Sequence, residues 1–130
     1  MSLSLPPRFP DIVTCIPHSG SMVLLDRILS VDAENLCAEV VIRSDSLFCD
    51  AALGVGSWVG VEYMAQAIAA YAGYGAALRG DAVKVGFLLG TRRYDAHCPY
   101  FAVGAVLHVA VERILQTENG VGSFECCITD

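Results

Sequence analysis

Apolar and polar positions divide the chain into short strand-like runs on either side of one long apolar segment. Met22 to Val31 is apolar apart from one charged pair and is a candidate for the start of a first strand. Leu36 to Arg43 is rich in β-forming residues and predicts a second strand. Beyond a glycine-containing loop over Asp50 to Gly56, the segment Trp58 to Leu78 has no proline, many alanines and one charge. It predicts a long helix with Ser57 as its N-cap.

Three further apolar runs follow this helix, over Val83 to Arg93, Val103 to Glu112 and Val121 to Ile128. Asn119-Gly120, between the last two, is a strong hairpin signal. The alternation in the middle run requires Ala110 to point outward. Strand, strand, long helix and three strands predict an α+β fold, in which a curved antiparallel sheet wraps one helix. Because the helix is apolar all round, we expect it to be buried all round.

The length of 130 residues predicts one domain over residues 1–130, with an irregular arm over the proline-containing residues 1–11. The chain start lacks the basic and apolar regions of an export signal, so we expect a cytoplasmic protein. Ala51 to Leu78 is apolar, but Glu62, Gln66 and several glycines interrupt it. We therefore expect no membrane span.

Charge, apolar content and cysteine spacing predict the kinds of partner, the assembly and the redox state of the thiols. A net charge of −6 disfavours nucleic acid and anionic membranes, and an acidic carrier protein would need a local basic patch. The apolar fraction of 55% is high for a soluble domain, so subunits are expected to bury surface against each other, most simply as a dimer. The six cysteines contain no Cys-x-x-Cys pair and are expected to be reduced and mostly buried: Cys15, Cys37, Cys49, Cys98, Cys126 and Cys127.

Glu62 is the one charged side chain between Asp50 and Arg79, and Gln66 follows it on the same helical face. Two polar groups on one stripe of an apolar helix indicate that this stripe meets a cleft, a partner subunit or a buried hydrogen-bond network. A buried carboxylate has a tunable pKa, which suits acid–base catalysis. A structural or capping carboxylate is the alternative.

Histidines are the other candidates for proton transfer. His18 lies in a loop among small residues, where a turn or surface role is the alternative to catalysis. His97 beside Cys98 is too sparse for a metal site, and His108 within a predicted strand is expected to face solvent. The sequence contains no nucleophile elbow, phosphate loop or metal box, so we expect no cofactor and no metal.

Several motifs, in order, resemble those of the 3-hydroxyacyl-(acyl-carrier-protein) dehydratases. They are Ile16-Pro17-His18 with Met22 to Ile28, Glu62 to Ala67, Gly86 to Gly90, and Gly104 with the strand after it. The resemblance spans most of the chain. It implies a hotdog fold, an active site shared between two subunits, and removal of water from a 3-hydroxyacyl thioester.

The usual catalytic histidine of that family, which precedes the helix glutamate, is missing. Phe48 stands at the equivalent position, and none of its neighbours is a histidine. The chain is most similar to an atypical branch that lacks this histidine and occurs with fatty-acid-like and aryl polyene biosynthesis clusters, a likeness that Gly60 to Gln66 carries. The family also has one more strand after the equivalent of Phe124 to Ile128. We therefore expect either a sheet one strand short or a longer native chain.

These features suggest roles for individual residues. Glu62 is the expected acid, base or both, with His18 as its partner, and backbone N–H groups around Gly56, Ser57 and Trp58 are expected to stabilise the thioester oxygen. Other expected substrate contacts, in part along an acyl tunnel, are Gln66, Gly86, Phe87 and Leu88. Four basic residues could receive an acyl carrier protein, or serve only solubility: Arg79, Lys84, Arg92 and Arg93.

Two other functions fit the same sequence. A hotdog thioesterase would use a similar carboxylate to activate water, although the apolar run ending in Asp26-Arg27 favours a dehydratase. A non-catalytic acyl binder, or a subunit that completes another subunit's site, would explain the missing histidine. The substrate is expected to be a thioester of acyl carrier protein or of coenzyme A, and the assembly a homodimer or a heterodimer of two hotdog subunits.

Overall fold

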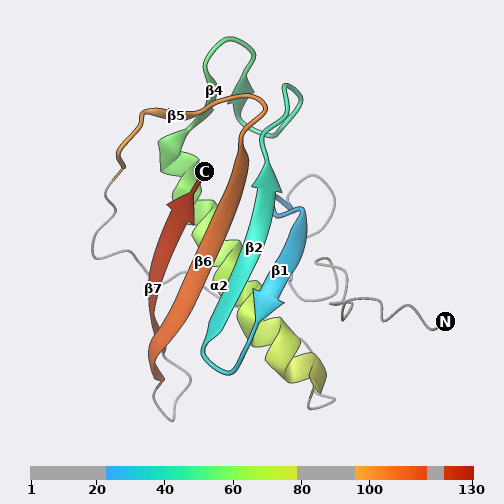
Figure 1. Cartoon of the computed structure of the whole chain (residues 1–130), viewed down its shortest axis with the longest axis vertical. Helices are drawn as coiled ribbons and strands as arrows, with labels where there is room; N and C mark the ends of the chain where they lie inside the picture. Colours follow the sequence, from blue (N-terminus) through green and yellow to red (C-terminus); the bar gives the residue numbers. More distant parts are fainter. Residues whose placement is uncertain (1–22, 79–95, 117–121) are drawn as a thin grey trace, which may run out of the picture.

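A four-stranded antiparallel sheet covers one side of a long helix in the computed structural model, which describes residues 23–78, 96–116 and 122–130 (Figure 1). The strands follow the order β1-β2-β6-β7, and the helix α2 crosses behind them. The bounds are Arg27–Val31 for β1, Asn35–Val41 for β2, Val106–Gln116 for β6, Gly122–Thr129 for β7 and Gly60–Leu78 for α2. The predicted α+β arrangement is confirmed.

Alternation along the central strands fixes which face meets the helix. On β6, Leu107, Val109 and Val111 are buried, whereas Ala110 and the other residues between them are exposed. The outward position expected for Ala110 is therefore correct. On β2, the residues paired with the buried residues of β6 are themselves buried: Leu36, Ala38 and Val40. These inward rows form the core against α2.

The helix is buried on one side only in this chain. Tyr63, Ala67 and Ala70 face the sheet and are at most 2% exposed. On the opposite face Ile68 is half-buried and Ala72 is exposed. The expectation of burial all round is thus wrong for the single chain, because a sheet can cover only one face of a helix.

A small second sheet lies at the start of the helix, and two of its strands, β3 (Cys49–Asp50) and β4 (Gly54–Gly56), fall where the sequence predicted a loop. It consists of β3, β4 and β5 (Tyr100–Phe101), and in Figure 1 it lies beyond the start of α2. Gly54 has a φ of +100°, and a Cβ there would lie 2.1 Å from the carbonyl oxygen of Phe101. Only glycine allows β4 to approach β5 this closely.

Ser57 is not the N-cap of the long helix. It begins a 3₁₀ turn, Ser57–Val59, which leads directly into α2; Gly56 is the N-cap, and no side chain caps the turn. The prediction was wrong because a serine ahead of a helical pattern can equally enter a 3₁₀ turn. The helix is therefore entered from β4 through a 3₁₀ turn that has no side-chain cap.

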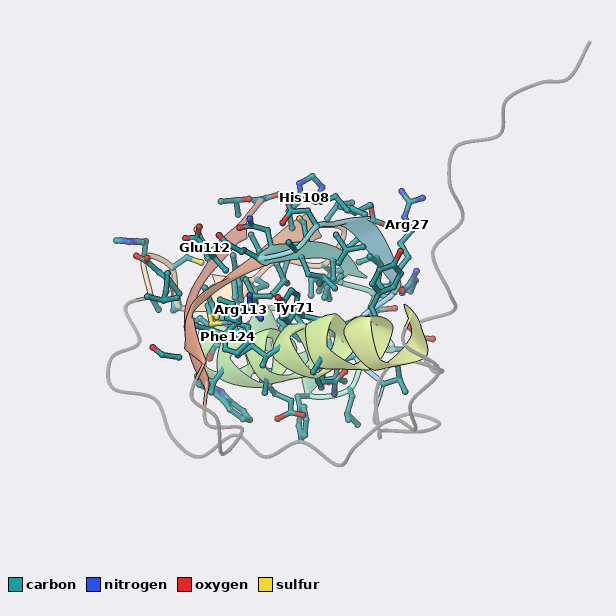
Figure 2. All side chains as sticks on the ribbon, turned by 90° about the horizontal axis from the view of Figure 1, so that it is seen from below. Arg27, Tyr71, His108, Glu112, Arg113 and Phe124 are labelled. Atoms are coloured by element: carbon teal, nitrogen blue, oxygen red, sulfur yellow. The ribbon has the colours of Figure 1, made fainter. Side chains whose placement is uncertain are left out.

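The turn between β1 and β2 is held by an aspartate and by the helix. Asp32 Oδ1 accepts hydrogen bonds from the backbone N–H groups of Glu34 and Asn35 at 2.9 and 2.8 Å. The Glu34 amide, followed by the side chain and amide of Asn35, lowers the pKa of the Asp32 carboxyl. Tyr71 donates from its hydroxyl to the carbonyl of Ala33. Figure 2 shows Tyr71 between helix and sheet.

Three of the other predicted strands fall largely within the described residues. The expected strands at Leu36 to Arg43, Val103 to Glu112 and Val121 to Ile128 are present, with their ends shifted by up to four residues. The N-terminal arm, the Val83 to Arg93 strand and the Asn119-Gly120 turn lie outside the described residues. Among the described residues, no helix is long and apolar enough to cross a membrane.

The described cysteines are unpaired, as expected for reduced thiols. The expected burial is wrong, because Cys98 and Cys127 are exposed and the remaining three are only partly buried. Cys98 lies in a bend, and Cys127 lies on the outward row of β7, which alternation assigns to solvent.

Candidate active site

Glu62 lies in the first turn of α2, where the helix dipole favours a negative charge. Its side chain is half-buried. One turn further along the same face, Gln66 donates from Nε2 to Glu62 Oε1 at 3.2 Å. The polar stripe that the sequence indicated is therefore a hydrogen-bonded pair.

Gln66 is held at its other end by the chain that enters β1. Its Oε1 accepts a hydrogen bond from the backbone N–H of Leu24 at 2.9 Å. Because an N–H can meet only the amide oxygen, this bond forces the NH₂ group toward Glu62. Leu24, Gln66 and Glu62 thus form a continuous chain of hydrogen bonds that fixes the orientation of the Glu62 carboxylate.

The expected contact between Gln66 and substrate stays a prediction. The Gln66 side chain is 0% exposed in the described chain. A fully buried amide whose oxygen and nitrogen both contact protein groups can orient its neighbours.

An aromatic pair lies before the helix, where the family's histidine would stand. Phe48 has a φ of 66°, a left-handed conformation that is rare for a bulky side chain and costs about 1 kcal/mol or more. Its ring lies 5.7 Å from that of Trp58, and both are exposed, at 52% and 66%. The position thus presents an exposed aromatic surface instead of an imidazole.

One backbone N–H group at the start of the helix already donates a hydrogen bond within the chain. The N–H of Ser57, one of the expected donors to a thioester oxygen, donates to the carbonyl of Pro99 at 2.9 Å in this chain. A Cβ on Gly56 would lie 2.4 Å from the Trp58 indole nitrogen, so glycine is what allows the indole to lie against β4. Gly56 and Trp58 remain the candidates for an oxyanion site.

The remaining predicted site residues lie outside the described part of the chain. They are His18, Arg79, Lys84, Gly86, Phe87, Leu88, Arg92 and Arg93. Of the histidines that are described, His97 and His108 are both exposed. His108 is on β6 and points away from α2, as expected for an outward strand position (Figure 2).

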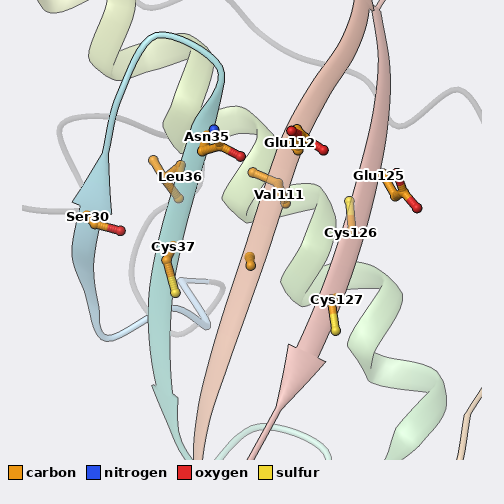
Figure 3. Close-up of a pocket in the computed structure, with 10 residues that line it drawn as sticks. Ser30, Asn35, Leu36, Cys37, Val111, Glu112, Glu125, Cys126 and Cys127 are labelled. Carbon is orange, nitrogen blue, oxygen red and sulfur yellow. The ribbon is translucent and has the colours of Figure 1, made fainter.

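A shallow hollow on the outer face of the main sheet is not this site. It has a volume of about 540 Å³, and its lining includes Cys37, Ala110 and Cys127 from adjacent strands, with Glu112 and Glu125 beside them. Figure 3 shows these side chains on the sheet with α2 behind it. Glu62 does not line the hollow, so the depression and the helix carboxylate are separate features.

A long helix with a carboxylate in its first turn, covered on one side by an antiparallel sheet, is the arrangement expected of a hotdog-fold subunit. The family model for ApeP-like proteins, described as ApeP dehydratase, matches residues 10–130. The chain belongs to this family, which confirms the predicted hotdog dehydratase of the aryl polyene type.

A solved structure supports the same conclusion. A chain of "The Dehydratase Heterocomplex ApeI:P from Xenorhabdus doucetiae" is 31% identical to this chain, with a TM-score of 0.88. The match covers 94% of this chain and 82% of that one. No curated protein sequence matches. The predicted hotdog fold is confirmed, and so is the predicted enzyme class, a lyase that removes water.

Proposed function

We propose that this dehydratase removes water from 3-hydroxyacyl thioesters carried by acyl carrier protein, with Glu62 as the acid–base group. The observation that carries the proposal is the hydrogen-bond chain from Leu24 through Gln66 to Glu62. It holds the single carboxylate of α2 in the first helical turn, half-exposed on a surface that is otherwise apolar. Such a hydrogen-bond chain fixes the direction of the carboxylate, as acid–base chemistry on a bound substrate requires.

The reaction requires one proton to leave C2 and one to reach the hydroxyl that departs from C3. The electron pair of the broken C2–H bond becomes the C2=C3 double bond as water leaves. Negative charge builds on the thioester oxygen during this step, and backbone N–H groups at the start of α2, at Gly56 or Trp58, would stabilise it. Gln66 donates to one oxygen of Glu62, which orients the carboxylate for proton transfer.

One carboxylate alone would have to serve both proton transfers, and Phe48, which stands at the position of the family's histidine, cannot transfer a proton. We therefore propose a second proton-transfer group. His18 is the candidate from this chain, and a second hotdog subunit is the other source. The solved structure that resembles this chain is a heterocomplex of two proteins, ApeI and ApeP. We propose a similar pairing here, in which the partner covers the half-exposed face of α2 and the exposed rings of Phe48 and Trp58.

Two of the described arginines are already paired with carboxylates. Arg27 pairs with Glu39 at 3.1 Å, and Arg43 pairs with Asp26 at 2.9 Å, so both are already neutralised. Arg79, Lys84, Arg92 and Arg93, or a basic surface of the partner, are the candidates for docking an acidic carrier. A coenzyme A thioester is the alternative substrate, since it presents the same phosphopantetheine arm.

Mass spectrometry of 3-hydroxyacyl-carrier-protein substrates tests the proposal, with the enzyme alone and with a second hotdog subunit. Wild-type protein should remove one water, and Glu62→Gln should lower the rate by about 100-fold or more. Glu112→Gln, which changes an exposed carboxylate on the outer face, is the matched control and should keep the wild-type rate. Full activity of Glu62→Gln would remove Glu62 from the reaction, and release of free acid and thiol would indicate a thioesterase.

The source of the second group is tested by His18→Ala in the same assay. A loss of about 100-fold without a change in thermal stability would place His18 in the site. An unchanged rate that depends on the second subunit would instead place the missing group on that subunit.

A further inference from the structure

Asp26 joins the segment before β1 to the end of β2 through both of its carboxylate oxygens. Oδ2 accepts a hydrogen bond from the backbone N–H of Val41 at 2.6 Å, and Oδ1 accepts one from Nη1 of Arg43 at 2.9 Å. The backbone N–H of Asp26 donates to the carbonyl of Glu39 at 2.8 Å. This one residue therefore fixes its own stretch of chain against β2 at three points.

The same stretch of chain carries the donor that orients the catalytic pair. Leu24, two residues before Asp26, gives its backbone N–H to Gln66, and Gln66 gives its own N–H to Glu62. Leu25, between Leu24 and Asp26, is 3% exposed in the core. A short, anchored segment transmits displacement, since its backbone has few torsions to absorb it.

A second hollow connects these groups in space. Leu24, Asp26, Arg43 and Tyr63 line a depression of about 240 Å³ beside the start of α2. Asp26 and Arg43 are thus neighbours of both Leu24 and the helix residue next to Glu62. Loss of the Asp26–Arg43 ion pair would therefore loosen the backbone segment that carries the Leu24 amide.

We propose that Asp26 is a positioning residue for the dehydration, acting through Leu24 and Gln66 on the orientation of Glu62. The proposal rests on the proposed role of Glu62. It gives the exposed Asp26–Arg43 pair a function that an ordinary surface ion pair, which contributes little to stability, does not have. Asp26 itself does not touch the reacting atoms.

The chain offers a matched control on the same two strands. Arg27 and Glu39 form a second ion pair among the described residues, with Arg27 Nε 3.1 Å from Glu39 Oε1, and Arg27 pairs with Glu39 in the β1–β2 register. The Glu39 side chain takes no part in the hydrogen-bond chain that leads to Gln66. A general effect of loosening this hairpin would appear in both Asp26→Ala and Glu39→Ala, whereas a positioning effect appears only in Asp26→Ala.

A double-mutant cycle tests the proposal, with kcat and KM measured for the enzyme in its active assembly. Asp26→Ala should lower kcat about 5–20-fold and leave KM within about 2-fold, because orientation acts on the chemical step. In a Gln66→Leu background the same change should cost less than about 2-fold, because the path to Glu62 is already broken. Glu39→Ala should cost less than about 2-fold in either background.

Two further measurements separate the outcomes. If Asp26→Ala does not fold, Arg43→Gln removes the ion pair but keeps the Val41 bond, and should show a smaller loss of kcat with the same dependence on Gln66. Hydrogen exchange of the Leu24 amide, which requires no activity, should accelerate in Asp26→Ala and not in Glu39→Ala. Equal losses with and without Gln66, or an unchanged Leu24 amide, would overturn the proposal. Full activity of Glu62→Gln would instead overturn the proposed function.

Discussion

Gln66→Leu tests most directly how the catalytic helix is organised. Leucine matches the size of glutamine and keeps the position buried, but it removes both hydrogen bonds of the side chain. The Leu24 N–H then loses its acceptor, which costs about 1–3 kcal/mol, and the added apolar burial offsets part of this. A net loss near 1 kcal/mol predicts a Tm lower by roughly 3–5 °C for a domain of this length.

The effect on the rate should exceed the effect on stability. In the Gln66→Leu variant, the Glu62 oxygen that accepts the Gln66 N–H in the wild type loses that hydrogen bond. A displacement of the carboxylate by about 1 Å can cost about 100-fold in rate. We therefore expect kcat to fall by about 10–100-fold with little change in KM. Initial rates of water loss, measured by mass spectrometry beside thermal denaturation curves, give both quantities.

Gln66→Glu separates the two hydrogen bonds. It keeps an oxygen to accept from Leu24, but it places a second carboxyl group where a donor met Glu62. The two carboxyl groups would share a proton, so the pH optimum for the rate should move upward. Gln66→Leu, which adds no titrating group, should lower the rate without that upward shift.

Two results would refute the reasoning. A lower Tm with kcat within about 2-fold of wild type would mean that Gln66 only supports packing. A higher KM at constant kcat would mean that Gln66 binds substrate, as its sequence position had suggested.

Three further predictions follow from the backbone and the titrating groups. Gly54→Ala should lower the free energy of unfolding by about 3 kcal/mol in chemical denaturation, whereas Gly104→Ala, also at positive φ but with open space around it, should cost only about 1 kcal/mol. Backbone hydrogen bonding lowers the pKa of Asp32, so its stabilising effect relative to Asp32→Ala, read as a difference in Tm, should be present above the ordinary value of 3.8 and disappear as pH falls through the lowered pKa. Burial raises the pKa of the Cys126 thiol to about 11, so iodoacetamide at about pH 8 should label exposed Cys127 first, as tandem mass spectrometry would show; faster labelling of Cys126 would contradict this.

The sequence by itself determined the elements whose patterns are long enough to read. The apolar run ending at Leu78 predicted the helix to within two residues at its start, because nineteen helical positions repeat one signal. Runs of β-forming and apolar residues between turn residues located β2, β6 and β7, with ends shifted by up to four residues. Glu62 could also be singled out from sequence, since a lone charge in an apolar helix is costly unless it has a role.

Only the tertiary structure decided how Glu62 is held. The bond from Leu24 to Gln66 joins positions 42 residues apart, and no local pattern encodes such a contact. The short strands β3, β4 and β5 have two or three residues each, too few for a readable period. The hydrogen bond from the Ser57 amide to the Pro99 carbonyl is another contact that no local pattern encodes, because Pro99 comes from a distant part of the chain. Residue types reveal where a charge is unusual, but the direction in which it points depends on long-range backbone contacts that form only when the chain folds.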